Sequence, residues 1–128
     1  FRYRKMKNRI IKFRVWNGEQ MVSPDYIDRQ GVAHWKENSI HTSSQNLLQF
    51  TGLKDKNGKE IFEGDIVKAS TTIDGDQKLM AVEWSVDRCN FSTYHPKING
   101  GWFPNIRKDT YLFFEVIGNI FENPELLT

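Results

Sequence analysis

The sequence predicts a mainly β protein built from many short antiparallel strands. Apolar and polar residues alternate over short runs, which is the period of a half-buried strand. Glycine, asparagine, aspartate and proline separate these runs at short intervals, as they do in tight turns. No segment keeps apolar residues at helical spacing over about ten positions, and no internal repeat occurs, so helices and repeat architectures are not expected.

The first predicted strand covers residues 10–16, where apolar positions alternate with basic ones. Asn17–Gly18 is a strong two-residue turn signal, so a short hairpin to residues 21–22 is expected. Residues 26–27 and 32–35 flank a turn around Gly31 and predict strand, turn, strand. Residues 36–45 are polar and are interpreted as a loop, and order resumes at residues 47–50.

The segment from Gln49 to Val67 carries the clearest hairpin signals. Asn57–Gly58 fits a type I′ turn, because both central residues of that turn need positive φ. Glu63–Asp65, with Gly64 at its centre, predicts a second turn. A longer strand is then expected from Ile66 to about Ile73, followed by a turn over residues 74–76 and a return strand over residues 79–84.

The remainder of the chain adds fewer elements. A short strand is expected over residues 91–94, residues 99–101 break the chain before Trp102, and residues 104–109 are interpreted as exposed loop. Residues 111–121 predict one or two strands with Gly118 at a bend or bulge. Residues 123–127 predict at most one helical turn, because asparagine is a good N-cap and proline is favoured at the first helical position.

Together these elements suggest a small, partly open SH3-like barrel over residues 50–121. The first 46 residues would form a β-rich extension packed on the barrel or on a neighbouring subunit. A length of 128 residues is that of one domain, expected to span residues 6–128. Met6 resembles a translation start, whereas Phe1 cannot initiate, so residues 1–5 are interpreted as a non-native extension.

Composition and charge narrow the classes of protein that remain. The single cysteine, Cys89, excludes an intrachain disulfide and predicts a reducing, cytoplasmic location. No apolar run is long enough to span a membrane or form a signal peptide. Residues 15–128 carry 11 basic against 16 acidic residues, a net charge of −5. Without residues 1–5 the counts are 15 and 16, so the basic character lies in the N-terminal segment: Arg2, Arg4, Lys5, Lys7, Arg9, Lys12 and Arg14.

Four segments of the chain, residues 11–16, 50–67, 81–84 and 115–127, together resemble the YopX family of small proteins encoded by bacterial phages and prophages. The resemblance spans residues 6–127, and the 50–67 block, FTGLKDKNGKEIFEGDIV, is its most specific part. It implies a phage or prophage origin and a bacterial host, and it brings no established activity and no catalytic residue. The motif residues are interpreted as structural: Thr51, Gly52, Asp55, Asn57, Gly58, Phe62, Glu63, Gly64, Asp65 and Trp84.

The residues give little reason to expect catalysis, a metal or a cofactor. The three histidines, His34, His41 and His95, are widely separated, Cys89 has no histidine or second cysteine beside it, and no catalytic or nucleotide-binding motif occurs. Glu63 and Asp65 form a pair of carboxylates, but Gly64 between them favours turn capping. Tryptophans at strand positions normally fill a core, and Trp84 is assigned to it.

Three functions remain as hypotheses. The first is a non-enzymatic phage protein that self-associates and binds an unidentified host or phage protein, because many short strands need their edges covered. The second is a nucleic-acid-binding regulator, which the acidic body disfavours. The third is a small enzyme with an unrecognised site. The second hypothesis depends on four basic residues: Lys7, Arg9, Lys12 and Arg14.

Overall fold

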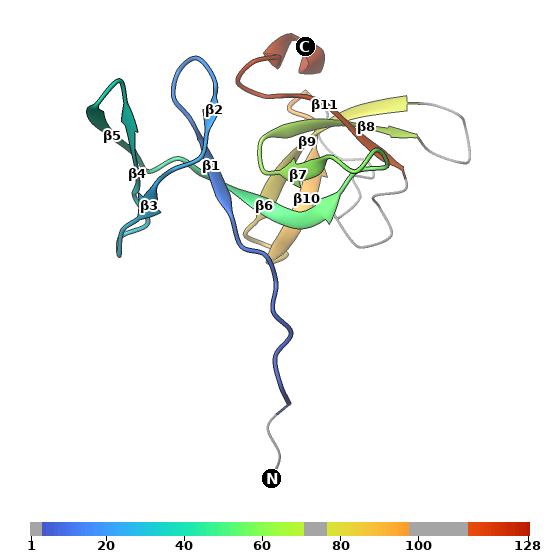
Figure 1. Cartoon of the computed structure of the whole chain (residues 1–128). Coiled ribbons are helices and arrows are strands. Elements are labelled where there is room, and N and C mark those ends of the chain that lie inside the picture. The colour runs from blue at the N-terminus through green and yellow to red at the C-terminus, as the bar shows by residue number, and fades with distance from the viewer. Residues whose placement is uncertain (1–3, 71–76, 98–112) are drawn as a thin grey trace.

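The computed structural model of the chain describes residues 4–70, 77–97 and 113–128. In these ranges it contains eleven strands and one 3₁₀ turn, arranged in three antiparallel sheets (Figure 1). The mainly β class with many short antiparallel strands is confirmed. The elements are β1 (Phe13–Trp16), β2 (Met21–Val22), β3 (Tyr26–Ile27), β4 (Ala33–Glu37), β5 (Ile40–Ser44), β6 (Leu47–Lys54), β7 (Glu60–Phe62), β8 (Asp65–Ser70), β9 (Gln77–Ser85), β10 (Asn90–Tyr94), β11 (Phe114–Asn119) and the 3₁₀ helix η2 (Pro124–Leu127).

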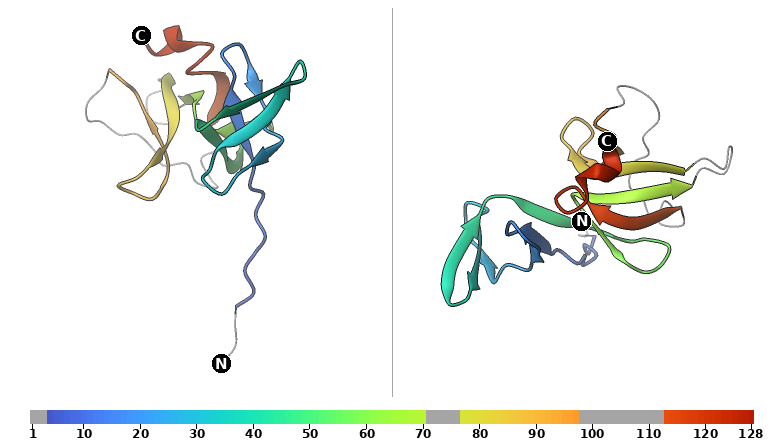
Figure 2. Two further views of the ribbon diagram at one scale, coloured as in Figure 1. Left: turned by 90° about the vertical axis from the view of Figure 1, so that its left-hand side faces the viewer. Right: turned by 90° about the horizontal axis from the view of Figure 1, so that it is seen from above.

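The three sheets lie side by side along the molecule (Figure 2). The order of the first sheet is β2-β1-β6-β7, that of the second is β10-β9-β8-β11, and that of the third is β3-β4-β5. The third sheet lies at one end, the second at the other, and β1 and β6 run between them. Strand β6 is shared, because its first half pairs with β1 and its second half pairs with β7 after a register shift between Phe50 and Lys54.

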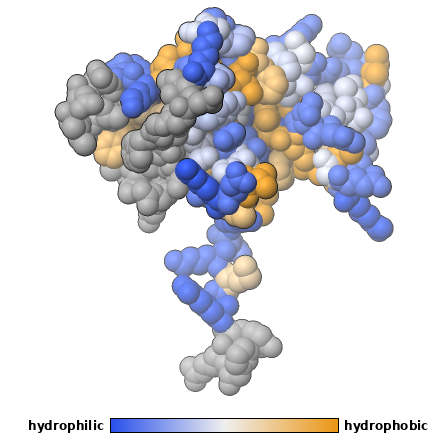
Figure 3. Space-filling view, turned by 180° about the vertical axis from the view of Figure 1, so that it is seen from behind, coloured by the Kyte–Doolittle hydropathy of each residue, from blue (hydrophilic) through white to orange (hydrophobic). Residues whose placement is uncertain are grey.

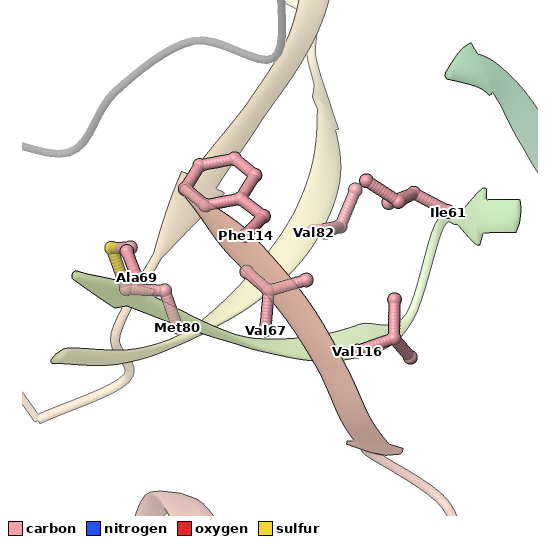
Figure 4. Close-up of a cluster of buried hydrophobic side chains, with 7 residues drawn as sticks. All are labelled: Ile61, Val67, Ala69, Met80, Val82, Phe114 and Val116. Carbon is pink, nitrogen blue, oxygen red and sulfur yellow. The ribbon is translucent and has the colours of Figure 1, made fainter. Parts of the chain in front are cut away.

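The main core lies between the second sheet and β7 (Figure 4). Alternate residues of β8 and β9 point into it, and Ile61 of β7 closes it from the opposite side. Burial of each large apolar side chain stabilises the fold by about 1.5–3 kcal/mol. The buried members are Ile61, Val67, Ala69, Met80, Val82, Phe114 and Val116.

Two smaller clusters hold the remaining elements. Val15, Ala33 and Trp35 are buried together and join the first sheet to the third. Ile66 and Ala81, on the other face of the second sheet, are covered by η2 through Leu127. The second sheet therefore buries residues on both of its faces, and its curl gives a half-barrel. The narrower SH3-like assignment stays a prediction.

Three expectations for local structure are wrong. Residues 36–45 are not a loop, because β4 and β5 form a hairpin through Asn38 and Ser39, both at positive φ. Asn57–Gly58 is not a type I′ turn, since only Gly58 has positive φ and its N–H donates to the carbonyl of Asp55 (3.0 Å). Trp84 is not in the core, because 45% of it is exposed.

Near the C-terminus, the bulge expected at Gly118 is confirmed by a register shift between Val116 and Gly118. The single helical turn is also present as η2, with Pro124 in its first turn. Asn123 does not cap it, because its side-chain oxygen accepts instead from the N–H of Asn119 (3.2 Å). Other expectations fall outside the described residues: the end of the strand near Ile73, the turn at 74–76, Trp102, and the segments 99–101, 104–109 and 111–112.

Candidate functional site

Two groups of polar side chains are candidates for function, and the first surrounds the β7–β8 turn. Arg14 of β1 forms an ion pair with Asp65 of β8, and its guanidinium also lies over the ring of Phe62 (4.5 Å to the centroid). The second oxygen of Asp65 accepts from the N–H of Phe62 (2.8 Å). Asp65 is only 2% exposed, so burial raises its pKa, and the Arg14 guanidinium offsets part of that rise.

Glu63 does not share this ion pair. Its Oε1 accepts from the backbone N–H of Gln49 (2.9 Å), and burial raises the pKa of its carboxyl above the ordinary value. Gly64, at positive φ, donates its N–H to Val82 and accepts from the N–H of Ile120. Each carboxylate therefore holds backbone or a cation of its own chain, an arrangement that fits a structural role for these acids.

The other motif residues brace the hairpin between β6 and β7. Thr51 donates its hydroxyl to the carbonyl of Ile61 (2.8 Å), and Gly52 and Gly58 both have positive φ. Asp55 is buried, and its two oxygens accept from the N–H groups of Asn57 (2.8 Å), Lys59 (2.9 Å) and Val116 (2.9 Å). Asp55 thus ties the hairpin turn to β11. Trp84 contacts Phe91 edge to face, with ring centroids 5.0 Å apart.

The basic residues proposed for nucleic-acid contact divide into two pairs. Lys12 forms an ion pair with Glu60 (2.5 Å), and Arg14 is engaged with Asp65. Lys7 and Arg9 lie in the extended N-terminal segment and are exposed. Two of the four cations are therefore engaged with carboxylates of the same chain, and two are exposed on the N-terminal segment.

The second candidate site lies on the outer face of the β3-β4-β5 sheet and was not predicted from the sequence. His34 Nε2 lies 2.8 Å from Asp28 Oδ2, and His34 Nδ1 lies 2.9 Å from His41 Nε2. The ring of Tyr26 stacks on that of His34, with centroids 4.6 Å apart. Four side chains from three neighbouring segments thus form one connected array.

Strand register explains this array. Tyr26 pairs with His34 across β3 and β4, and Lys36 pairs with His41 across β4 and β5, so His34 and His41 are diagonal neighbours on one face. Asp28 follows β3 and is held by the N–H groups of Gln30 (2.9 Å) and Val32 (3.0 Å) on its Oδ1.

The charges of this array follow from its hydrogen bonds. The hydrogen bond from His34, reinforced by the backbone N–H of Val32, lowers the pKa of Asp28, so its carboxylate is ionised and acts as acceptor. His34 Nε2 therefore carries a proton. Between His34 Nδ1 and His41 Nε2 one nitrogen must donate and the other accept, so the contact holds one proton.

Larger ligand sets do not occur in the described ranges. Among residues 4–70, 77–97 and 113–128, no group of three or more His, Cys, Asp or Glu side chains is placed to hold a metal ion. Cys89 is exposed and forms no disulfide. No helix in the part of the chain that the structure describes is long and apolar enough to cross a membrane.

The fold and these contacts define a small β protein in which polar motif residues brace turns and join two sheets. The chain belongs to the YopX family, because the family model described as "YopX protein" matches residues 12–128. The family expected from the sequence is confirmed.

Individual relatives agree with this assignment. The SPbeta prophage-derived uncharacterized protein YopX of Bacillus subtilis (strain 168) is 28% identical over an alignment of 136 positions, gaps included, that covers 90% of this chain and 94% of that protein. The crystal structure of yopX from B. subtilis has a TM-score of 0.59 at 26% identity, covering 91% of this chain and 95% of that one. Protein EF1440 from Enterococcus faecalis shares the fold, with a TM-score of 0.59 at 24% identity over 94% of this chain and 100% of its own.

Proposed function

We propose that this chain is a phage- or prophage-encoded protein of the bacterial cytoplasm that acts without catalysis, as a protein-interaction module that self-associates. The prophage origin of the Bacillus relative supports the first part. The N-terminal segment supports self-association. Residues 4–11 form an extended arm that leads away from the three sheets (Figure 1), whereas Lys12 is already held by the backbone of Phe50 and the carboxylate of Glu60.

The single observation that carries self-association is the exposure of apolar side chains on this arm. Met6 is 87% exposed, Ile10 69% and Ile11 54%. Exposed clusters of large apolar residues are typical of surfaces that bind a partner. An extended segment can cover the unpaired edge of a strand in another molecule, as in β-strand addition.

Charge favours a second copy of the chain as the partner. In the chain that begins at Met6, the arm (residues 6–11) carries two basic and no acidic residues, whereas residues 12–128 carry 13 basic against 16 acidic residues, a net charge of −3. Opposite charges on the arm and the body steer the arm of one copy toward the body of another. Figure 3 shows mostly hydrophilic residues along the arm and an apolar patch where the arm meets the sheets.

Light scattering coupled to gel filtration tests this proposal on protein that begins at Met6. We expect an oligomer at micromolar concentration, and a shift toward monomer when Met6, Ile10 and Ile11 are all replaced by serine. The matched control replaces Lys7 and Asn8, exposed residues of the same arm, by serine and should retain the oligomer at high salt. A strictly monomeric parent chain would reject self-association.

The exposed cations of the arm also support the second candidate, a nucleic-acid-binding regulator. Of the four basic residues on which this hypothesis depends, Lys7 and Arg9 are exposed in one extended segment, and such a segment can follow a phosphate backbone. Fluorescence anisotropy with labelled DNA and RNA over a salt series separates the two proposals. Absence of binding at low salt rejects this one, and Lys7→Gln with Arg9→Gln should abolish any binding that occurs.

A further inference from the structure

We propose that His34 and His41 form a binding site for a divalent transition-metal ion of the copper(II) or nickel(II) class. The two histidines lie on the outer face of the β3-β4-β5 sheet, and His41 is exposed. Imidazole nitrogen is a preferred ligand of these ions. The inference is independent of the proposed self-association.

The separation of the two nitrogens fits one ion between them, and because the two ring planes are inclined by only 10°, the rings must turn so that their lone pairs converge on it. His34 Nδ1 and His41 Nε2 are 2.9 Å apart. Two ligand nitrogens that each lie about 2.0–2.1 Å from a metal are separated by about 2.9 Å when they subtend a right angle, and by about 3.4 Å at a tetrahedral angle. Right angles belong to square-planar and octahedral coordination, which are the geometries of copper(II) and nickel(II).

Asp28 prepares His34 for this role. Ligating histidines almost always donate their other ring N–H to a carboxylate or carbonyl, which fixes the tautomer and increases the basicity of the ligating nitrogen. His34 Nε2 has this contact with Asp28 Oδ2 (2.8 Å), so in neutral His34 the lone pair is on Nδ1, the atom that faces His41. The stacked ring of Tyr26 restricts rotation of the imidazole further.

Binding requires one rearrangement of protons. In the neutral pair, His41 Nε2–H donates to His34 Nδ1, and the metal needs a lone pair on both atoms. The His41 proton must therefore move to its Nδ1 by exchange with water, which the exposure of His41 permits. No net proton is released when an ion binds the two neutral rings.

Two neighbours of the pair define the remainder of the site. Lys36 is the cross-strand partner of His41, so its positive charge belongs to the same face of the sheet and disfavours a cation there. Ser43 is the cross-strand partner of His34. Within the described residues no third ligand completes the set, so water occupies the other coordination positions.

Isothermal titration of the untagged chain with copper(II), nickel(II), zinc(II) and magnesium(II) tests the proposal near neutral pH. We expect one copper or nickel ion per chain, weaker zinc binding, and no magnesium binding. His34→Ala and His41→Ala should each weaken copper binding by about tenfold or more, and Asp28→Asn by about tenfold, the usual effect of removing an orienting carboxylate. The matched control is His95→Ala, which removes the remaining histidine of the chain and should leave the affinity unchanged.

Two further measurements distinguish a lost site from a lost fold. Lys36→Ala should increase the copper affinity, a change that unfolding cannot produce. Electron paramagnetic resonance of the copper complex should show coupling to two imidazole nitrogens, reduced to one in His41→Ala. Equal affinity of the parent chain and the two histidine variants, or loss of binding in His95→Ala alone, would overturn the proposal.

Discussion

Arg14 of β1 and Asp65 of β8 form an ion pair that joins the first sheet to the second. Only 17% of the Arg14 side chain and 3% of the Asp65 side chain are exposed, so the pair is shielded from water. Arg14 also donates to the carbonyl of Glu63 (3.4 Å) and lies over Phe62. The Arg14 side chain thus contacts the end of β7, the β7–β8 turn and the start of β8, all within residues 50–67.

Replacing Arg14 by methionine should therefore destabilise the protein strongly. The change leaves the Asp65 carboxylate buried without its cation, and breaking a buried pair in this way costs about 3–5 kcal/mol. Urea unfolding measures the free energy. The matched control is Lys12→Met, which removes the exposed pair with Glu60 and should cost less than about 1 kcal/mol. Equal losses for the two variants would show that the Arg14 pair has no special weight.

Substitution of Asp55 should also destabilise the protein. Replacement by alanine leaves the N–H groups of Asn57, Lys59 and Val116 without their acceptor, and this costs about 1–3 kcal/mol for the buried donor of Val116 and less for the two donors that water can reach. Asparagine retains one oxygen for the turn but presents an amide N–H₂ to Val116, so its loss should be intermediate. Thermal unfolding of both variants checks this order. Asp87→Asn, at an exposed position, is the control and should stay within about 0.5 kcal/mol of the parent.

The turn between β6 and β7 predicts that alanine substitution costs unequal amounts of stability at the adjacent positions 57 and 58. Gly58 has a φ of 84°, and alanine there should cost about 1–2 kcal/mol because a Cβ disfavours the left-handed region. Asn57 has no positive φ, so Asn57→Ala should cost much less. A type I′ turn would instead penalise both substitutions. Chemical denaturation of the two single variants decides between the turn types.

Glu63 should give the stability curve a pH dependence of definite sign. Burial raises its pKa above the ordinary value of 4.5, so the folded state binds the proton more tightly than the unfolded chain does. The contribution of Glu63 to the free energy of unfolding is fully present below pH 4.5 and is lost as the pH rises through the raised pKa. Glu63→Gln keeps an acceptor for the N–H of Gln49 and lacks the charge, so it should be more stable than the parent at neutral pH.

A comparison of the parent chain with Glu63→Gln at acidic pH is the control for the prediction on Glu63. Below the ordinary pKa of Glu63, both carry a neutral side chain at position 63, and the difference in unfolding free energy should vanish. A difference that persists unchanged in acid would mean that packing of the amide, and not the charge, sets the stability of the variant.

Alternation and turn residues were enough to predict most strands, and the failures have identifiable causes. The β4–β5 hairpin was missed because its outer face meets water and therefore carries polar residues, which resemble a loop in sequence. Asn38 and Ser39 are the signal that could have found it, since both tolerate positive φ. With that turn placed, the pairing of Lys36 with His41 follows directly.

The candidate metal site was missed for the same reason. His34 and His41 look unrelated when the residues between them are interpreted as loop, and become diagonal neighbours once the hairpin register is known.

Trp84 shows a different limit of prediction from the sequence. Alternation places it on the same face as Met80 and Val82, but β9 extends beyond the buried cluster, so size and apolar character predicted burial that the strand end does not provide.

Strand β6 belongs to both ends of the molecule, since residues 47–49 pair with β1 and residues 50 and 54 pair with β7. A cut in the link between Ser44 and Leu47 would give two fragments, each with an open sheet edge whose missing partner is in the other fragment. Halves ending and beginning there should reassemble when two attached proteins bring them together, which would make this chain a scaffold for reporting whether those proteins meet inside a cell.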